Sequence, residues 1–520
     1  MKKFRTPKQE ESGALIAMIA TIFGGWVRLF APWVAGFPLN DGGLFHSMIL
    51  TVRENQYRLP QYVEYNGLSI PFAYPAFGFY IGAFLSQITG ASPVEILRWL
   101  PAIISVGTIP AFYWLAKSLL GSSFKAGIAT FIYAFIPRAM SWALMGGGLT
   151  RSFGLLFLLL TLASIHALFK NPNKKFLFAS ILFSALTILS HPEAAIHTVA
   201  FSILIWIFEG RNKQGILNAL SVGLGTLILT APWWLTLLIR FGLDPILAAT
   251  GTGFHSAIAL LIPFVYILTD EPSTTFIAVL GVIGLAINLR QGKFLLPVAY
   301  LLPFVVEPRS APVYAMIPLG MLAAAALSDV ILPVLTHLPG RNLVLKIFVP
   351  YLALYMIGNA FYFDTQFAGT SVSPANREAF EWIKTNTPPK SRFLILTGET
   401  DVFCDGIPEW FPALTGQTSL TTIQGTEWLP GKFAPASQLQ RDMQGCLNEM
   451  DSFACVEEQA KQAGIQYDYL YIANQSTLKS MCRVIQPISR GSELIRALES
   501  DKDFAPVYQT DKVSIFLRKR

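Results

Sequence analysis

The feature that most constrains this chain is a series of apolar stretches long enough to cross a lipid bilayer. They recur from residue 13 to residue 363 and then stop. A helix needs roughly twenty apolar residues to span a hydrocarbon core of about 30 Å. Only 14% of the residues are charged, against about 25% in an ordinary soluble domain. The sequence therefore predicts an α-helical polytopic membrane protein with a soluble domain at its C-terminal end.

The pattern predicts about eleven membrane helices. They are expected at residues 14–33, 98–117, 126–142, 152–169, 176–190, 194–208, 215–239, 273–289, 294–306, 313–334 and 345–363. The first is too long for the apolar core of a signal peptide. Because the segments beside His191 and Glu307 are short, we expect their outer ends to lie below the membrane surface. This geometry predicts a cavity that is open to the outside.

Basic residues set the expected orientation in the cell membrane. Lysines and arginines gather in short loops between apolar stretches, as is typical of the cytoplasmic side. The clusters contain Lys2, Lys3, Arg5, Lys8, Lys117, Lys125, Lys170, Lys174, Lys175, Arg211, Lys213, Arg290, Lys293, Arg341 and Lys346. The N-terminus is then cytoplasmic and the C-terminal domain extracytoplasmic. The net charge of +7 is explained by these loops and does not predict a nucleic-acid partner.

Two apolar segments do not cross the membrane in this orientation. Residues 75–90 fall in the first outer loop, residues 34–97; if they crossed, the basic loop 170–175 would lie outside. Residues 256–269 have both ends outside. We interpret both segments as interfacial helices on the outer face. The expected domains are residues 1–370, which span the membrane, and residues 371–520, which are soluble.

The C-terminal domain is predicted to be a small mixed α/β domain. Ser373 is a candidate N-cap followed by Pro374 at the first helical position, and this helix should end before Pro388. Residues 392–398, 467–473 and 513–519 have the apolar, β-branched and aromatic character of strands.

All four cysteines lie in this domain: Cys404, Cys446, Cys455 and Cys482. An even count outside the cytoplasm is consistent with two disulfides, and we favour a Cys446–Cys455 pair because it closes a short loop. Buried free thiols are the alternative. The sequence does not favour a zinc site, because it has no CxxC pair and no nearby histidine.

Polar residues that need an explanation gather on the predicted outer face. They are Asp41, His46, Glu64, Arg98, the stretch 146–151 (GGGLTR) with Arg151, His191, Glu193, His255 and Arg309. Arginines can hold a phosphate with two parallel hydrogen bonds, and a carboxylate can take a proton from an attacking hydroxyl. Such a set suits chemistry on a lipid-linked anionic substrate. No GxGxxG, P-loop or HExxH motif is present.

Each of these residues also has a structural interpretation. Asn40 or Asp41 could cap the amphipathic helix that follows, and the glycines 146–148 could mark a helix break. His46 could be structural, His191 could end a helix, and Arg309 could pair with Glu307.

The order of these features resembles the GT-C superfamily of integral membrane glycosyltransferases, similar to protein mannosyltransferases and aminoarabinose transferases. The matching stretches are PLNDGGLFHSM after the first membrane helix, YPAFGFYIGAFLSQITG in the first outer loop, and EILRWLPAIISVGTIPAFYWLAKSLLG at the second membrane helix. The likeness in architecture covers the whole chain, and the likeness in motifs covers about its first 120 residues.

The resemblance implies a sugar donor on a polyprenyl phosphate and a role for Asp41 as catalytic base. In oligosaccharyltransferase relatives this acid is a metal ligand, which leaves open a divalent cation, Mg²⁺ or Mn²⁺. Many members have a second acid beside the first, whereas this chain has Gly42. The oligosaccharyltransferase motif WWDYG is absent. The stretches 409–416 (EWFPALTG) and 424–431 (QGTEWLPG) are expected to be loops, which either face the acceptor or only pack.

The expected function is therefore an inverting hexosyl- or pentosyltransferase with Asp41 as base or metal ligand. Arg309, with Arg98 or Arg151 as further candidates, would bind the donor phosphate. The acceptor is a glycan, a lipid or a protein, and membrane lipids surround the bundle. The alternatives are an oligosaccharyltransferase-like enzyme, a sensor or assembly protein, and a transporter or flippase of a lipid-linked substrate. A transporter would need ionisable residues within its spans, of which Asp329 is the clearest.

Overall fold

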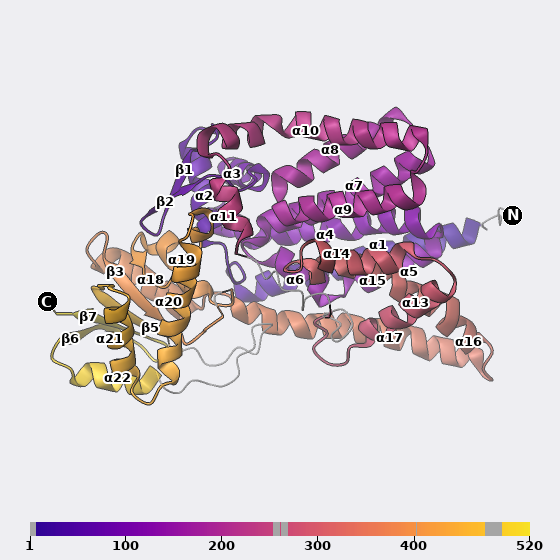
Figure 1. The fold of residues 1–520 in the computed structure, drawn as a ribbon. Helices are drawn as coiled ribbons and strands as arrows, with labels where there is room; N and C mark the ends of the chain where they lie inside the picture. The colour runs from indigo at the N-terminus through magenta and orange to yellow at the C-terminus, as the bar shows by residue number, and fades with distance from the viewer. Residues whose placement is uncertain (1–6, 253–260, 262–268, 402, 474–490, 520) are drawn as a thin grey trace.

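The computed structural model describes residues 7–252, 261, 269–401, 403–473 and 491–519. A long bundle of helices occupies one end of the molecule, and a small domain built around a sheet occupies the other (Figure 1). The N-terminus lies at the far end of the bundle and the C-terminus in the sheet domain. The predicted fold class, a polytopic helical membrane protein with a C-terminal mixed α/β domain, is confirmed.

The membrane bundle has a helix at each position where the sequence predicts one. These helices are α1 (Pro7–Ala35), α4 (Pro93–Leu120), α5 (Ser123–Ala134), α6 (Pro137–Leu144), α7 (Gly148–Lys170), α8 (Lys174–Ser190), α9 (Pro192–Glu209), α10 (Lys213–Phe241), α13 (Phe276–Arg290), α14 (Leu295–Val306), α15 (Ala311–Ala326) and α17 (Arg341–Phe367). Seven helices in the described part of the chain are long and apolar enough to span a bilayer. Helices α8, α13 and α14 are shorter, with 17, 15 and 12 residues.

Two predicted spans differ from single straight helices. The third is broken between α5 and α6, which are bent by 55° where Pro137 begins α6; proline lacks the N–H that would continue the helix and disfavours a helical residue before it. The tenth continues past α15 through a π-helical turn, η2 (Leu327–Ile331), into α16 (Leu332–Thr336). The longer path gives this span 26 residues.

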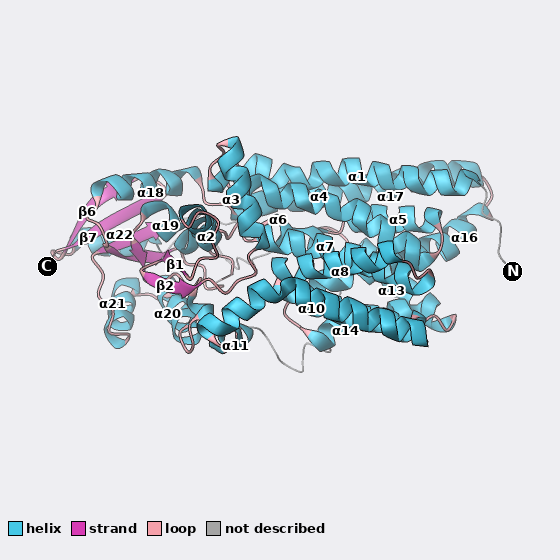
Figure 2. Ribbon diagram, turned by 90° about the horizontal axis from the view of Figure 1, so that it is seen from above, coloured by secondary structure: helices cyan, strands magenta, loops and turns pink. Residues whose placement is uncertain are grey.

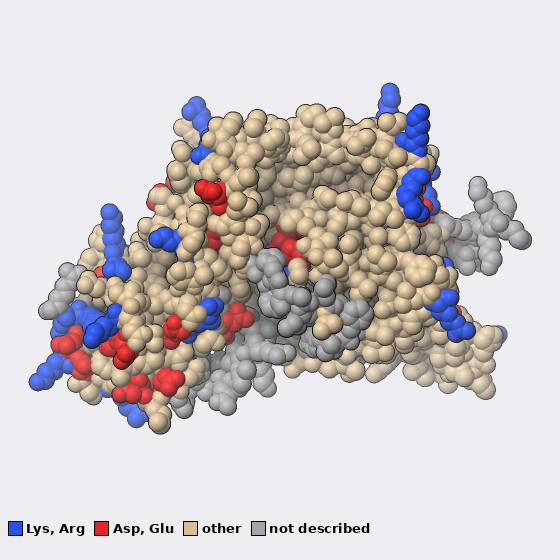
Figure 3. Space-filling view, viewed as in Figure 1, with Lys and Arg blue, Asp and Glu red and all other residues tan. Residues whose placement is uncertain are grey.

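The basic turns lie at the end of the bundle that is remote from the sheet domain. Lys117, at the end of α4, pairs with Glu10 of α1 across 3.1 Å, and Lys125 of α5 pairs with Asp329 across 2.5 Å. Charged atoms are visible over the sheet domain and at the far end of the bundle, whereas the surface between them is largely uncharged (Figure 3). This distribution agrees with a multi-pass membrane protein, and the side on which each terminus lies stays a prediction.

The most buried arginine and the most buried acidic residue of the described bundle are two that the sequence analysis did not name. Asp329 lies at the basic end and is paired, whereas Arg28 of α1 and Asp364 of α17 have no exposed surface. Arg28 donates hydrogen bonds to the Ala134 carbonyl at 2.7 Å and to Ser105 at 3.2 Å. It therefore binds the carbonyl left free where α5 ends.

The first outer loop folds into a compact cap on the bundle. It contains α2 (Gly43–Glu54), the antiparallel hairpin β1 (Tyr62–Tyr65) and β2 (Leu68–Pro71), and α3 (Phe77–Thr89), while α11 (Asp244–Thr250) follows α10. Helix α3 is the helix predicted at residues 75–90. The second predicted interfacial helix, residues 256–269, falls almost entirely outside the described residues.

The C-terminal domain is built on a five-stranded mixed sheet. The strands are β3 (Arg392–Leu396), β4 (Thr418–Ser419), β5 (Tyr469–Ala473), β6 (Phe504–Gln509) and β7 (Val513–Arg518), in the order β4-β3-β5-β7-β6. Strand β3 is parallel to β4 and β5, and β7 is antiparallel to β5 and β6. The three predicted strands are β3, β5 and β7. Figure 2 shows helices on both sides of this sheet.

The described part of this domain also contains helices. They are α18 (Pro374–Asn386), α19 (Gly406–Thr415), α20 (Phe433–Gly445), α21 (Ser452–Gln462) and α22 (Gly491–Ser500), with short 3-10 turns η3 (Ala368–Thr370), η4 (Thr426–Trp428) and η5 (Cys446–Asn448). Ser373 caps α18 by accepting the Asn376 N–H at 3.3 Å, as predicted. Residues 409–415 belong to α19 and Gly416 is its C-cap, so the prediction of the stretch 409–416 as a loop was wrong.

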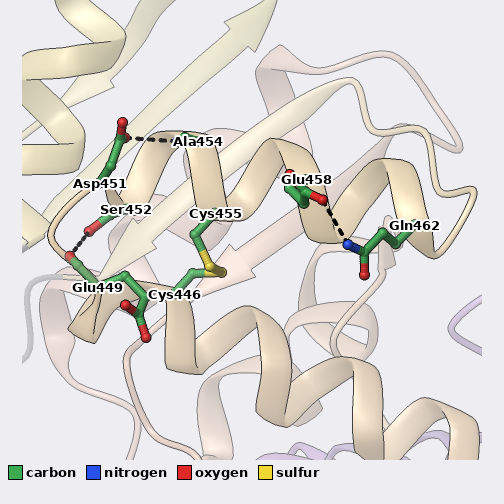
Figure 4. Close-up of a disulfide and its surroundings, with 8 residues drawn as sticks. All are labelled: Cys446, Glu449, Asp451, Ser452, Ala454, Cys455, Glu458 and Gln462. Atoms are coloured by element: carbon green, nitrogen blue, oxygen red, sulfur yellow. Dashed lines mark hydrogen bonds between the residues drawn. A yellow bond between two sulfur atoms is a disulfide. The ribbon is translucent and has the colours of Figure 1, made fainter.

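The predicted Cys446–Cys455 disulfide is confirmed. It joins η5 to α21, with 5.5 Å between the two Cα atoms (Figure 4). Cys404 is also disulfide-bonded, and Cys482 lies outside the described residues.

The outer loop and the sheet domain share one hydrophobic core. Its buried members come from α2, α3 and the hairpin as well as from β3, β5, β7 and α19. Trp410 of α19 is fully buried, and its ring meets the edge of Phe37 at a centroid distance of 4.8 Å. The sheet domain is therefore packed onto the bundle over the point where α1 ends.

Candidate active site

Asp41 lies in the short segment between α1 and α2. One carboxylate oxygen, Oδ1, accepts the backbone N–H of Gly147 at 2.8 Å. The other, Oδ2, faces Arg151 Nη1 at 3.3 Å, and 23% of the Asp41 side chain remains exposed. Neither Asn40 nor Asp41 caps α2: Gly42 is the N-cap residue and no side chain bonds there. The carboxylate is thus oriented by the turn between α6 and α7.

The glycines of that turn allow the backbone to approach Asp41 closely. A Cβ atom on Gly147 would lie 2.5 Å from Asp41 Oδ2, and one on Gly146 would lie 2.0 Å from the Asp41 carbonyl. The turn also marks the end of α6 and the start of α7. Residues 146–148 therefore mark a helix break, as one interpretation expected, and their backbone contacts Asp41; a role of this turn in substrate binding stays a prediction.

Arg151 connects the Asp41 segment to a cavity in the bundle. The cavity is lined by Trp142, Ala143, Arg151, Leu155, His191, Glu193, Ser310, Val313 and Tyr314. These residues come from α6, α7, α9 and the start of α15 and from the junctions beside them. The guanidinium of Arg151 lies 5.3 Å from the centre of the Trp142 ring. Four predicted site residues, Asp41, Arg151, His191 and Glu193, are thus joined directly or through this cavity.

Arg309 contacts Glu193, one of the residues that line this cavity. Its Nε lies 3.8 Å from Glu193 Oε1, and its guanidinium stacks 5.3 Å from the ring centre of Phe403 in the soluble domain. The side chain of Glu307 accepts the backbone N–H groups of Arg309 and Ser310 at 3.2 and 2.8 Å. Glu307 therefore holds the turn, and the Arg309 side chain pairs with Glu193 instead.

Of the two described histidines of the predicted site, His191 is buried and His46 is half-buried. His191 caps α9 by accepting the Ala194 N–H at 3.4 Å, so it is a helix-end residue that also lines the cavity. His46 of α2 lies against Trp410, with ring centres 6.3 Å apart. Burial, followed by the charge of Lys384, lowers the pKa of His46 to about 4. His46 is therefore neutral and serves as packing for the Asp41 segment.

Two other predicted site residues, Arg98 and Glu64, are not brought to Asp41 by any contact that the structure describes. Arg98 donates to the Pro32 carbonyl at 2.9 Å and pairs with Glu95 at 3.3 Å, which joins α4 to the end of α1. Glu64 is exposed on the hairpin and accepts the Ser69 hydroxyl at 2.6 Å. His255 lies outside the described residues.

Sequence reasoning missed Glu409 and Trp410 of the soluble domain, which bond the backbone on either side of Asp41. Glu409 Oε1 accepts the Gly42 N–H at 3.1 Å, and Trp410 Nε1 donates to the Asn40 carbonyl at 2.9 Å. The stretch 409–416 was noticed for its aromatic composition. No local pattern indicates a contact between residues 367 positions apart.

The described residues do not fit a divalent metal ion at Asp41. Both oxygens of the carboxylate already face donors, one of them the cationic Arg151, which opposes a second cation nearby. Among the described residues there is no group of three His, Cys, Asp or Glu side chains arranged to hold a metal. We therefore derive no step of the chemistry through a metal.

No protein-family description and no curated protein sequence matches this chain. Solved structures do match it. ArnT from Cupriavidus metallidurans in the apo state superposes with a TM-score of 0.57 at 13% identity, covering 95% of this chain and 97% of that one. The arabinofuranosyltransferase AftD from Mycobacteria gives 0.56 at 15% identity, covering 98% of this chain and 40% of that one.

The oligosaccharyltransferase of Archaeoglobus fulgidus, solved in complex with Zn and sulfate, gives a TM-score of 0.55 at 14% identity and covers 88% of this chain and 68% of that one. ArnT was also solved bound to undecaprenyl phosphate, and the Archaeoglobus enzyme with dolichol-phosphate and an inhibitory peptide. At such identities the likeness establishes the fold. The chain has the fold of the GT-C integral membrane glycosyltransferases, as its first outer loop predicted.

Proposed function

We propose that this protein is a membrane glycosyltransferase that moves a sugar from a polyprenyl-phosphate donor to an acceptor on the extracytoplasmic side. The observation that carries the proposal is the partly exposed Asp41 carboxylate, which lies beside Arg151 and its cavity where the bundle meets the soluble domain. The GT-C fold supports it, because ArnT, which shares the fold, was solved with undecaprenyl phosphate.

In this proposal Asp41 acts as the general base. It takes the proton of an acceptor hydroxyl, whose oxygen attacks the anomeric carbon from the side opposite the phosphate. The bond between the anomeric carbon and the phosphate oxygen breaks, and polyprenyl phosphate departs with the electron pair. The configuration of the sugar is inverted. The Gly147 N–H fixes Oδ1, so the carboxylate is oriented before the acceptor arrives.

Arg151 and Arg309 are the proposed ligands of the donor phosphate. Arg151 lines the cavity, and Arg309 lies 3.8 Å from Glu193, which also lines it. A phosphate that replaces Glu193 as the partner of Arg309 and binds beside Arg151 would receive charge-assisted hydrogen bonds from both guanidinium groups. These bonds would stabilise the charge that the leaving phosphate gains. Arg98 is not assigned this role, because its contacts join α1 to α4.

The experiment is a transfer assay with the purified protein in lipid. It is given radiolabelled polyprenyl-phosphate sugars, one at a time, and a crude cell-envelope fraction as acceptor, and the anomeric configuration of any product is determined by NMR. We expect transfer from one donor class with inversion. Retention of configuration would contradict the base mechanism. Movement of labelled lipid between leaflets without transfer would support the flippase alternative.

A further inference from the structure

We propose that helix α19 of the soluble domain is a positioning element for Asp41, acting through Glu409 and Trp410. This inference rests on the proposed role of Asp41. Glu409 bonds the N–H of Gly42 at 3.1 Å and Trp410 bonds the carbonyl of Asn40 at 2.9 Å. These two bonds hold the backbone immediately before and immediately after Asp41. Neither residue touches the Asp41 carboxylate in any contact that the structure describes.

Helix α19 lies so close to the Asp41 segment that a side chain on Gly42 or Gly43 would collide with it. A Cβ atom on Gly43 would lie 2.2 Å from the Glu409 carbonyl oxygen, and one on Gly42 would lie 2.8 Å from the Trp410 ring. Gly42 also has a φ of 134°, which side chains other than glycine rarely adopt. A two-glycine segment is therefore required for α19 to approach this closely.

The membrane bundle holds the same segment from the other side. Gly146 donates its N–H to the Leu39 carbonyl at 2.9 Å, and Gly147 donates its N–H to the Asp41 carboxylate. The Asp41 backbone is thus fixed between a turn of the bundle and a helix of the soluble domain. A displacement of about 1 Å at a reacting group can cost about 10²-fold in rate. Loss of either set of bonds should therefore reduce turnover.

The Glu409 side chain can accept the Gly42 N–H whether its carboxyl group is charged or protonated. It is 4% exposed, and burial, followed by the charge of Asp41, raises its pKa to about 8, against the lowering effect of the Gly42 hydrogen bond. A protonated carboxyl still accepts a hydrogen bond through its carbonyl oxygen. A glutamine at this position offers the same acceptor. The positioning role therefore predicts that glutamine preserves activity and that alanine does not.

The test compares Glu409→Ala, Glu409→Gln and Trp410→Phe in the full-length protein. The matched control is Glu457→Ala, which removes a carboxylate of the same domain that pairs with Arg518 at 2.7 Å. The first readout is hydrogen–deuterium exchange of peptides covering residues 37–48, which can be measured without substrate. Transfer is measured with the donor found active in the panel of polyprenyl-phosphate sugars, and Asp41→Asn is assayed alongside.

We expect exchange in residues 37–48 to rise about tenfold in Glu409→Ala, as for the loss of one buried hydrogen bond. Its kcat should fall about 10²-fold, with the donor KM little changed. Trp410→Phe should show the same pattern more weakly, and Glu409→Gln and Glu457→Ala should behave as wild type. Unchanged exchange and kcat in Glu409→Ala would overturn the inference. Normal transfer by Asp41→Asn would instead overturn the role of Asp41, whatever the exchange shows.

Discussion

Two segments of the first outer loop contact the soluble domain in different ways. At the tip of the hairpin, the Asn66 amide bonds the carbonyl and the N–H of Ser419 at 2.9 and 2.7 Å. Ser419 lies on β4, the edge strand of the sheet. The side-chain amide therefore continues the pairing of an otherwise open edge. This is a docking contact, since it holds one domain against the other.

The Asp41 segment, in contrast, is bonded on both sides. It accepts hydrogen bonds from the α6–α7 turn of the bundle. With α19 of the soluble domain it makes one hydrogen bond as donor and one as acceptor. It also carries a carboxylate that is still partly exposed. The interface between the outer loop and the soluble domain therefore contains two kinds of contact. We expect substitutions at the hairpin to change stability and substitutions around Asp41 to change turnover.

Among substitutions that leave the Asp41 carboxylate in place, the largest effect is expected from Gly43→Ala. Its Cβ would lie 2.2 Å from the Glu409 carbonyl oxygen, so α19 and the Asp41 segment would have to separate. We expect kcat for transfer to fall about 10²-fold or more. The matched control is Gly445→Ala in α20, where a Cβ would meet nothing within 4 Å. Equal kcat values for Gly43→Ala and Gly445→Ala would contradict the distinction between a positioning contact at Asp41 and a docking contact at the hairpin.

Arg151→Lys and Arg309→Lys should have the next largest effect. Lysine keeps the charge but loses the planar pair of donors that matches a phosphate. We expect the KM for the polyprenyl-phosphate donor to rise about tenfold or more, as for loss of one hydrogen bond to a charged group. Arg53→Lys, an exposed arginine of the same outer loop, is the control. A donor KM unchanged in both cavity variants would contradict the assignment of the phosphate site.

Asn66→Ala should lower stability without changing turnover. The substitution leaves two backbone groups of Ser419 without their partner, which costs about 1–3 kcal/mol when such groups are buried. Thermal unfolding of the purified protein measures this loss, and the transfer assay measures kcat. Should kcat fall as far as it does in Gly43→Ala, the hairpin would also be a positioning contact.

The pH dependence of Glu409 should give the smallest effect. Its pKa rises on folding from 4.5 to about 8, so the folded state binds the proton more tightly and loses stability as the pH rises between these values. The change is at most about 1.4 kcal/mol for each pH unit. Glu409→Gln should therefore gain stability relative to wild type between pH 5 and 8, measured by thermal unfolding. A constant difference across this range would show that Glu409 does not titrate there.

Much of the fold could be predicted because its signals are local. Long apolar stretches located the membrane helices, and Ser373 with Pro374 located the start of α18. The hairpin was missed although its signal was present. Asn66 and Gly67, with φ of 54° and 72°, form the two-residue turn that favours this dipeptide.

The site could be predicted only in part. The first outer loop led to the prediction of Asp41, and the charge bias to that of Arg309, because each stands out among its neighbours in sequence. Glu409 does not stand out, since its importance comes from packing against Gly42, which lies in another domain. The sequence ranked Arg98 and Arg151 as equal candidates for the phosphate site. Their contacts differ: Arg98 joins α4 to the end of α1, whereas Arg151 faces Asp41.

The proposed role of Asp41 as general base can be tested by single-turnover transfer with Asp41→Asn. Glu54→Gln, an exposed carboxylate of the same outer loop, is the matched control, and exchange of residues 37–48 verifies that the segment stays folded. We predict that the rate of Asp41→Asn falls by about 10²–10⁴-fold, while donor binding and the rate of the control remain those of wild type. A rate equal to wild type in a folded Asp41→Asn protein would contradict the account.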